Sequence, residues 1–410
     1  MQSPAKSKAR GLVIIGFAES FSSPEVAWSL VEAGFAVVAF ARKNSKPALA
    51  SSQYATIFEV TAPEEDVAAA LRDVENGITR ILETTHSPVS LLVLDDAALW
   101  IRARLKVDSR LTVVGPSNVE IALDKSHQIE AARSAGFKVP ATFTPAIGEA
   151  WREPPFGFPL ILKPVKAITE KEGRLDKGRF YICRTRVDYE AALKKIPTDG
   201  SMMAQQYVSG VGEGLFGLAT PKGILAWSAH QRIRMMNPSG SGASACISIA
   251  PDGKDVSAGE KFIECVSWRG PFMIELLRAE NGEIWFMEFN GRIWGSTALA
   301  RRCRLEYPAW AVCDALNQNE AIPNNAQAPV GVVCRHAGRE IVHGLFVMRG
   351  PRSQTPGKWP SRWTTVKHLL NFRRSDFWYN WRRDDWRVFF KDVRSTIAGN
   401  VFKKKQPKRP

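Results

Sequence analysis

Residues 272–292 read FMIELLRAENGEIWFMEFNGR, and this stretch carries the most informative pattern in the 410-residue chain. Two apolar runs flank the pair Asn281-Gly282, which is typical of a β-hairpin turn. Glu275 lies on the first predicted strand and Glu288 on the second. Pairing of the strands around the turn would bring the two carboxylates to the same end of the hairpin.

The second predicted strand places Glu288, Asn290 and Arg292 at alternate positions, which share one face of a strand. Two carboxylates and an amide oxygen are ligands of the kind that Mg²⁺ prefers. Without a metal the two acids would repel, and one would have to remain protonated. Arg292 offers a fixed fork for a phosphoryl or carboxylate group. An exposed hairpin face with ordinary charges explains this segment alone equally well.

The composition predicts a globular chain of two or three domains, with 45% hydrophobic residues. The longest apolar run, residues 89–101, is interrupted by Asp95 and Asp96 and is too short for a membrane helix. The basic and then apolar beginning resembles a signal peptide, but βα spacing favours a first strand over residues 11–16. Six cysteines without metal-ligand spacing predict reduced core thiols and a cytoplasmic location.

The basic charge of the chain lies at its end. Residues 331–410 hold 19 of the 56 Lys and Arg residues and 5 of the 41 Asp and Glu residues, a net charge of +14. The remaining 37 basic and 36 acidic residues leave residues 1–330 with a net charge of +1. The body and the C-terminal extension therefore need separate explanations.

The order of apolar runs predicts two kinds of sheet. Residues 1–115 alternate strands and helices, which indicates an α/β domain with a parallel sheet, although its first turn lacks the GxGxxG of dinucleotide sites. Residues 116–330 are α+β and largely antiparallel. In this part we expect one helix over 118–136 with Gly136 as its C-cap, and a second helix capped by Asp188.

Several features occur in a fixed order along the chain. Lys125 lies in DKSHQIEAARSAGFKVP and Lys163 in the apolar strand LILKP, and MMAQQYVSGVGEG precedes the hairpin. Taken together, these residues resemble the ATP-grasp superfamily, which includes carbamoyl-phosphate synthetase, biotin carboxylase and D-alanine–D-alanine ligase. The resemblance covers roughly residues 11–310 and depends on the ordered set, not on any one motif.

The resemblance implies a fold of four parts. A pre-ATP-grasp, Rossmann-like α/β domain (1–115) is followed by a first ATP-grasp lobe with a lid (116–204) and a second lobe with the metal site (205–330). A basic, Trp-rich helical extension (331–410) lies outside the family core.

The resemblance also implies roles for individual residues. Lys125 and Lys163 match basic residues that contact nucleotide phosphates, and Gln205, Gln206, Tyr207 and Val208 match the hinge that reads adenine. Glu213 resembles a ribose contact. Glu275, Glu288 and Asn290 match the ligands of two Mg²⁺ (or Mn²⁺) ions, and Arg292 matches the arginine beside the transferred phosphate.

Arg232 and Arg234 alternate on a strand that precedes a Gly- and Ser-rich segment, residues 237–245. This pattern favours a catalytic substrate loop in which one arginine orients the carboxylate or the acyl phosphate. An exposed strand face is the alternative, and the neighbouring His230 is expected to be structural.

One residue and one segment of this sequence differ from the pattern of the family. Many relatives carry an acid at or near Gln206, where this chain has an amide. The lid, residues 166–180, is normally glycine-rich but here reads KAITEKEGRLDKGRF, with only Gly173 and Gly178. A weakened ATPase is one consequence that the sequence leaves open.

The implied function is an ATP- and Mg²⁺-dependent, ADP-forming ligase that activates a small-molecule carboxylate as an acyl phosphate and couples it to an amine. The alternatives are a carboxylate–thiol ligase, bicarbonate activation of the carbamoyl-phosphate type, and a nucleotide-binding regulatory or scaffold protein with little turnover. An oligomer is left open.

The C-terminal extension carries an amphipathic pattern. Apolar residues recur at helical spacing among arginines and lysines, and an unstructured end, 403–410, follows; the apolar positions are Tyr379, Trp386, Phe389, Phe390, Val393 and Ile397. The first interpretation is a helix packed on the body. The second is attachment of residues 370–410 to an anionic membrane surface at the inner face of the membrane. A nucleic-acid partner ranks lower because no nucleic-acid module is present.

Overall fold

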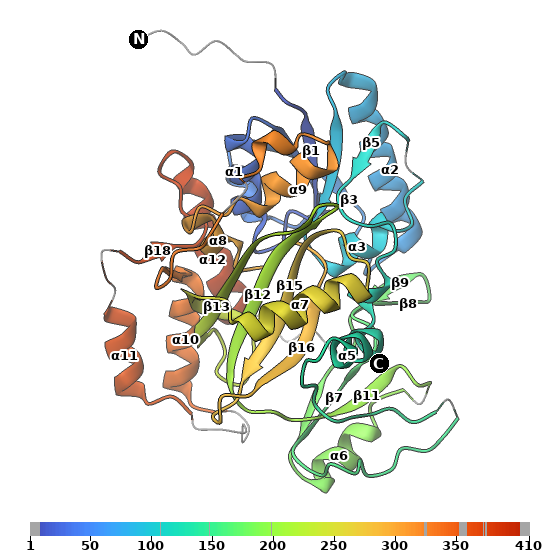
Figure 1. The fold of residues 1–410 in the computed structure, drawn as a ribbon, viewed down its shortest axis with the longest axis vertical. Helices are drawn as coiled ribbons and strands as arrows, with labels where there is room; N and C mark the ends of the chain where they lie inside the picture. Colours follow the sequence, from blue (N-terminus) through green and yellow to red (C-terminus); the bar gives the residue numbers. More distant parts are fainter. Residues whose placement is uncertain are drawn as a thin grey trace.

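A computed structural model describes residues 9–106, 108–146, 148–197, 199–323, 326–351, 359–371, 373 and 375–401. Figure 1 shows a parallel sheet with its helices, a large antiparallel sheet crossed by helix α7, and a smaller antiparallel sheet at the far end. Within the described residues, no helix combines the length and hydropathy needed to cross a membrane.

The N-terminal sheet is parallel, as the alternating pattern predicts. Its strand order is β3-β2-β1-β4-β5, and its helices pack beside it. Buried apolar runs form the central strands, and Asp66 and Asp95 cap two of the helices through their side chains. The elements are β1 (Leu12–Gly16), α1 (Ser23–Glu32), β2 (Ala36–Arg42), η1 (Ala48–Ser51), β3 (Ala55–Val60), α2 (Val67–Thr84), β4 (Val89–Val93), α3 (Asp96–Arg102) and β5 (Leu111–Val113).

A four-stranded antiparallel sheet follows, with strand order β10-β7-β11-β6. Its inner face packs on α6 through Leu160, Leu162 and Tyr189. The elements are α4 (Glu120–Leu123), α5 (Lys125–Ser134), β6 (Thr142–Phe143), β7 (Leu160–Pro164), β10 (Tyr181–Cys183), α6 (Arg186–Leu193) and β11 (Met202–Gln206).

Two helix predictions in this region are wrong in detail. The single helix expected over 118–136 is divided, because Asp124 is extended and its side chain accepts hydrogen bonds from the amides of Ser126 and His127. Thr185, not Asp188, caps α6, and Asp188 instead accepts a hydrogen bond from the Arg184 amide. In both places a short polar side chain competes for backbone amides and moves the helix start.

The predicted lid segment contains a short hairpin of β8 (Thr169–Lys171) and β9 (Arg174–Asp176). The hairpin lies against the N-terminal part of the chain. The Leu175 amide donates to the Pro63 carbonyl, and the Val67 amide donates to the Gly173 carbonyl, both at 2.8 Å. Leu175 and Ile168 are each 3% exposed, so the lid is anchored by apolar contacts as well as by backbone hydrogen bonds.

The large sheet has seven strands in the order β16-β15-β12-β13-β14-β17-β18. Alternate residues of its strands face two different layers. Leu215 packs with Phe262 of α7 on one face, whereas Phe216 contacts Trp294 on the other, at 4.5 Å between ring centroids. The elements are β12 (Val211–Thr220), β13 (Gly223–Met235), β14 (Ala243–Ile249), α7 (Gly253–Cys265), β15 (Gly270–Arg278), β16 (Ile284–Asn290), α8 (Thr297–Arg302), α9 (Tyr307–Ala315), η2 (Asn319–Ala321), β17 (Val333–Arg335) and β18 (Phe377–Trp378).

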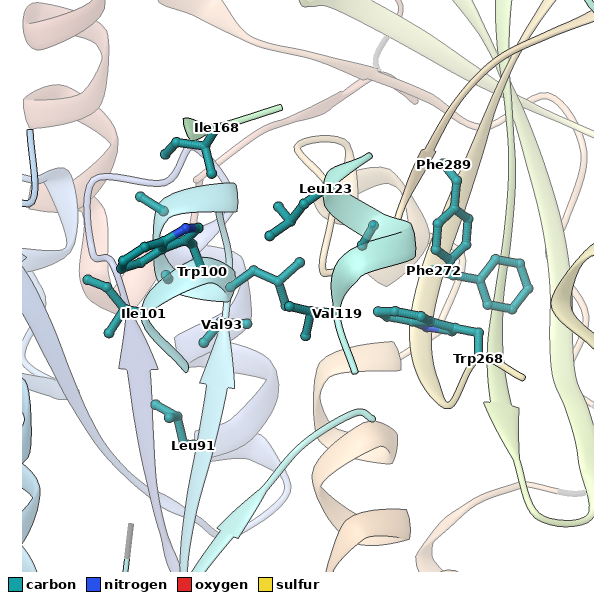
Figure 2. Close-up of a cluster of buried hydrophobic side chains, with 14 of the residues drawn as sticks. Leu91, Val93, Trp100, Ile101, Val119, Leu123, Ile168, Trp268, Phe272 and Phe289 are labelled. Atoms are coloured by element: carbon teal, nitrogen blue, oxygen red, sulfur yellow. The ribbon is translucent and has the colours of Figure 1, made fainter. Parts of the chain in front are cut away.

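One apolar cluster connects the N-terminal sheet to the large sheet. Figure 2 shows Trp100 and Ile101 beside the parallel strands, Val119 and Leu123 in the middle, and three aromatic rings on the large sheet. These rings belong to Trp268, Phe272 and Phe289. Helix α4 therefore fills the space between the two sheets with buried side chains.

The C-terminal extension packs on the body. It contains α10 (Ala337–Arg349), α11 (Arg362–Leu370), η3 (Arg383–Asp385) and α12 (Trp386–Val401), and β18 adds a strand to the large sheet. Tyr379 was predicted on the same helix as Trp386, but it follows β18 instead and is buried. The predicted unstructured end, 403–410, lies outside the described residues.

All six cysteines are unpaired. Five are buried, as expected for core thiols, but Cys265 is exposed at the end of α7.

Candidate functional site

The hairpin predicted at Asn281-Gly282 is formed by β15 and β16 and places Glu275 directly opposite Glu288. Its turn closes through a hydrogen bond from the Gly282 amide to the Ala279 carbonyl, and Gly282 has a φ of 83°. An extra residue, Met287, shifts the register between Leu276 and Glu275. This bulge sets the two carboxylates on opposite positions of one strand pair, because regular pairing would have placed Met287 there.

Each of the two carboxylates has a cationic partner. Lys125 Nζ lies 3.2 Å from Glu288 Oε1, and Arg232 Nη2 lies 2.7 Å from Glu275 Oε1. Two basic residues from other elements therefore lie against the two acids and offset their mutual repulsion. Lys125 is the first residue of α5, and its position depends on the Asp124 cap.

Lys163 lies on β7 near the same acids. Burial lowers the pKa of Lys163 to about 8, Glu288 and Glu275 oppose this shift, and the charge of Lys125 adds to it. Two lysines, Lys125 at the start of α5 and Lys163 on β7 of the four-stranded sheet, thus approach the carboxylates of the hairpin. This is the grouping that the ordered sequence motifs predict.

Arg292 follows β16 and forms an ion pair with Asp96, at 2.7 Å between Nε and Oδ1. Burial alone would raise the pKa of Asp96, but the adjacent Arg292 holds it below its usual value. Asp96 is a partner that the sequence interpretation missed. Its signal was the Asp95-Asp96 pair directly after a buried parallel strand, where polar side chains collect in α/β sheets.

The two arginines of β13 have different surroundings. Arg232 contacts Glu275, whereas Arg234 forms a buried ion pair with Glu340 of α10, at 2.6 Å. Irregular pairing between β13 and β14 separates the two positions. Arg232 therefore lies beside the hairpin carboxylates, and Arg234 joins the sheet to the C-terminal extension.

The predicted hinge residues connect the four-stranded and seven-stranded sheets. Gln205 is buried, and its amide group donates to the Thr142 hydroxyl at 3.1 Å. The amides of Gln206 and Tyr207 donate to the carbonyls of Ala141 and Pro159. Val208 is partly buried in the same link, which ends where β12 begins.

Glu213 is buried on β12. Its carboxylate accepts hydrogen bonds from Arg278 at 2.8 and 3.0 Å, and one from Gln231 at 3.2 Å. The structure thus places this residue in an ion pair close to the hinge.

A cavity of about 200 Å³ opens beside the hairpin. His230 lines it in the neutral form, because burial lowers its pKa to about 3, with a further contribution from Arg232. Apolar side chains and three arginines make up much of the remaining wall. The lining includes Phe21, Arg232, Met273, Glu275, Asn290, Arg292, Trp294, Arg339 and Tyr379.

The donor set of the hairpin suits Mg²⁺. Glu275, Glu288 and Asn290 (opposite Met273 on the strand pair) offer two carboxylates and one amide oxygen. Among the described residues, no cluster of three or more His, Cys, Asp and Glu side chains is placed to hold a metal. Two acids and an amide fit an ion that takes its remaining ligands from water and phosphate.

No protein-family model matches the chain, and no curated protein matches it in sequence. Its structure is similar to solved structures. One is an ADP complex of purK, N5-carboxyaminoimidazole ribonucleotide synthetase, with a TM-score of 0.60 and 13% identity, covering 88% of this chain and 96% of that chain.

Two other similar structures are a biotin carboxylase domain and an amino acid ligase. The biotin carboxylase domain of the Hydrogenobacter thermophilus 2-oxoglutarate carboxylase, described with MgADP, ADP and bicarbonate, has a TM-score of 0.59 and 15% identity over 80% of this chain and 74% of that one. The L-amino acid ligase from Bacillus licheniformis has a TM-score of 0.51 and 17% identity, covering 76% and 75%.

These neighbours define the class of fold. The chain has the ATP-grasp fold, which confirms the resemblance inferred from its sequence motifs. Within that class, its structure is similar to synthetases, carboxylases and ligases of small molecules, and their identities of 13 to 17% describe fold alone.

Proposed function

We propose that the chain is an ATP- and Mg²⁺-dependent ligase that activates a carboxylate and joins it to an amine. The observation that carries the proposal is the cross-strand pair Glu275–Glu288, with Lys125 and Lys163 from the preceding elements directed at it. On an ATP-grasp fold, this combination of acids and lysines suits a triphosphate with its metal.

In this proposal the four-stranded and seven-stranded sheets are the two lobes, and ATP binds between them. The link 205–208 faces adenine, and Lys125 and Lys163 contact phosphate oxygens. The hairpin β8–β9 covers the phosphates as a lid and excludes water from the reacting groups. Glu213 is proposed to orient the ribose side of the site through its contact with Arg278.

Glu275, Glu288 and Asn290 would hold two Mg²⁺ ions (or Mn²⁺). When bound, the ions would neutralise phosphate charge during transfer. The substrate carboxylate attacks the γ-phosphorus of ATP, which gives an acyl phosphate and ADP, and the amine then displaces phosphate. Arg292 and Arg232 stabilise negative charge at the reacting groups, and Arg234 supports the strand that carries Arg232.

A substrate panel tests this function. Purified protein is incubated with MgATP, and ADP release is measured across small carboxylates, each with and without amines or thiols. We expect ADP release that requires one carboxylate and one amine. Release with thiols instead would identify the carboxylate–thiol alternative. Nucleotide binding without ADP release for any pair would support a regulatory protein and contradict the ligase.

An ¹⁸O-labelled carboxylate tests the acyl phosphate. We expect one labelled oxygen in the inorganic phosphate released per turnover. Phosphate without label, in a reaction that still releases ADP, would rule out activation of that carboxylate.

We also infer that the C-terminal extension contacts an anionic membrane surface. Of the 15 exposed large apolar side chains in the described residues, 10 lie in residues 341–401, within the basic part of the chain. On α12, Trp386 and Phe390 are 49% and 58% exposed, and Arg387, Lys391 and Arg394 lie beside them. Exposed aromatic rings among basic residues suit a lipid interface with negative headgroups.

Vesicle co-sedimentation tests this contact. Wild-type protein should bind phosphatidylserine-containing vesicles in a salt-sensitive manner, and the double variant Trp386→Ser, Phe390→Ser should lose most binding. Val187→Ser removes an apolar side chain on α6 that is even more exposed, at 74%, and should have no effect. Absence of binding by wild-type protein, or equal loss in the control, would contradict the contact.

A further inference from the structure

Of the three arginines that line the cavity beside the hairpin, two have an acidic partner within the described part of the chain and one does not. Arg232 is paired with Glu275, and Arg292 is paired with Asp96. Arg339, the third arginine of the cavity wall, forms no ion pair among the described residues. His230 adds no charge because it stays neutral. The cavity therefore contains one positive charge that the protein does not neutralise.

Arg339 enters the cavity from α10, in the C-terminal extension. Its Nη1 donates a hydrogen bond to the Ala243 carbonyl at 3.0 Å, and its guanidinium carbon lies 3.7 Å from the centre of the Phe21 ring. These two contacts hold the guanidinium flat against the wall and leave other N–H groups without a carboxylate. Gly242 keeps this side of the cavity open, because a Cβ there would lie 3.0 Å from Arg339 Nη1.

The charge of Asp392 acts on Arg339, but the two residues form no ion pair. Asp392 on α12 accepts hydrogen bonds from His336 at 2.7 Å and from Asn380 at 2.8 Å. Burial lowers the pKa of Arg339 from its usual value, as expected for a cation without a close counter-charge. A partly buried, unpaired guanidinium is costly to maintain, and an anionic ligand would remove that cost.

We propose that Arg339 binds a second anionic group on the carboxylate substrate. The proposal rests on the ligase function above and deepens it, because it defines the substrate as a small acid with two anionic groups. The carboxylate to be activated lies at the Glu275–Asn290 end, near Arg232 and Arg292. The second group, a carboxylate or a phosphate, lies against Arg339 and the neutral hydroxyl of Tyr379. Apolar residues between them, such as Met273 and Trp294, suit a short carbon chain.

Matched pairs of ligands test this subsite. In the presence of MgADP, calorimetry measures binding of succinate, glutarate and 3-phosphonopropionate, and of the half-amides of the two diacids and propionate. We expect wild-type protein to bind a dianion roughly 10- to 100-fold more tightly than its single-charge counterpart. The phosphonate and diacid arms distinguish the two kinds of anionic group.

The variant Arg339→Gln should abolish this preference while leaving binding of the single-charge acids within about threefold. Arg349→Gln, on the exposed end of the same helix, removes the same charge outside the cavity and should keep the preference. Because the preference is a ratio within one variant, partial loss of folded protein does not change it.

The outcomes separate the two proposals. Equal affinity for dianions and single-charge acids in wild-type protein, or an unchanged preference in Arg339→Gln, would overturn the subsite even if ADP release is observed. A preference that depends on Arg339 supports the subsite even if no amine yields ADP release, a result that would count against the ligase alone.

Discussion

In the candidate nucleotide site, burial shifts the pKa of the Lys163 side chain toward neutral pH. Lys163 lies on a buried strand, with two acids and a second lysine nearby, and its pKa is about 8. Near neutral pH the side chain is therefore mostly charged, and a modest rise in pH removes the charge. Nucleotide phosphates stabilise the charged form, so binding and protonation are linked.

This linkage predicts that ADP affinity falls as pH rises from about 7 to about 9.5, because binding requires the proton that Lys163 loses near pH 8. Lys163→Arg should bind ADP with little pH dependence in this range, since arginine remains charged. Lys163→Ala should weaken binding at about pH 7 by roughly 10- to 100-fold. Calorimetry measures the ADP affinity of the wild-type protein and of both variants. Binding by the wild-type protein that does not depend on pH would contradict a phosphate contact by Lys163.

At the scale of residues, the sequence was enough to predict most of the charged side chains that lie together in the candidate site. It did not predict which ion pairs the arginines form. Alternation and the Asn281-Gly282 turn were enough to predict that Glu275 and Glu288 share a site. The bulge at Met287 and the Asp96 partner of Arg292 depend on tertiary packing, which periodicity does not encode. For the same reason, the pairing of Arg234 with Glu340 was not foreseen.

The lid hairpin is the element whose behaviour matters most for the proposed reaction. It is anchored to the N-terminal part of the chain by Leu175 and by two backbone hydrogen bonds, although it lacks the usual run of glycines. In the proposed reaction this hairpin would have to open for nucleotide exchange, and these contacts would be broken during each cycle.

Leu175→Ala should release the lid, because removing a buried leucine side chain costs about 2–5 kcal/mol. We expect faster hydrogen exchange at the Val67 amide, which donates to Gly173, and at the Leu175 amide itself. Arg174→Ala changes an exposed neighbour on β9 and serves as the control. Identical exchange at Val67 in wild type and Leu175→Ala would show that the leucine does not anchor the hairpin.

Strands were easier to predict from the sequence than helix boundaries. The first parallel strand, expected over residues 11–16, is found as β1 (Leu12–Gly16), an almost continuous apolar run. The division of the helix at Asp124 was missed because apolar periodicity continues through that residue, whereas its side chain caps the next helix. An N-cap side chain stabilises the start of a helix by about 1 kcal/mol. The pattern of apolar residues does not show whether this free energy is enough to end one helix and begin the next.

Across the whole molecule, the C-terminal extension is joined to the N-terminal sheet. Asp385 is buried and accepts hydrogen bonds from the Trp28 indole at 2.8 Å, from the Ser52 hydroxyl and from the Gln53 amide at 3.2 Å. The sequence separated the extension from the body by its charge. It contained no signal for this contact, which joins residues more than 300 positions apart.

Asp385→Ala should lower the free energy of unfolding by about 2–4 kcal/mol, because it leaves buried donors without acceptors. Asp384→Ala alters the adjacent exposed acid, which contacts Arg382 and Tyr54, and should cost less than about 1 kcal/mol. Urea denaturation followed by tryptophan fluorescence compares the midpoints. Equal midpoints for the two variants would mean that Asp385 does not secure the extension.

The most direct test of the carboxylate-activating ligase compares Glu288→Gln with Glu283→Gln. Both changes remove one charge from the same hairpin, but Glu283 lies at the turn and pairs with Lys138 at 2.6 Å, away from the candidate metal ligands. With a carboxylate and amine that support turnover, Glu288→Gln should lose roughly 100-fold or more in ADP release while its unfolding midpoint is kept. Glu283→Gln should keep its rate. A well-folded Glu288→Gln variant that releases ADP at the wild-type rate would contradict the metal site and the reaction assigned to it.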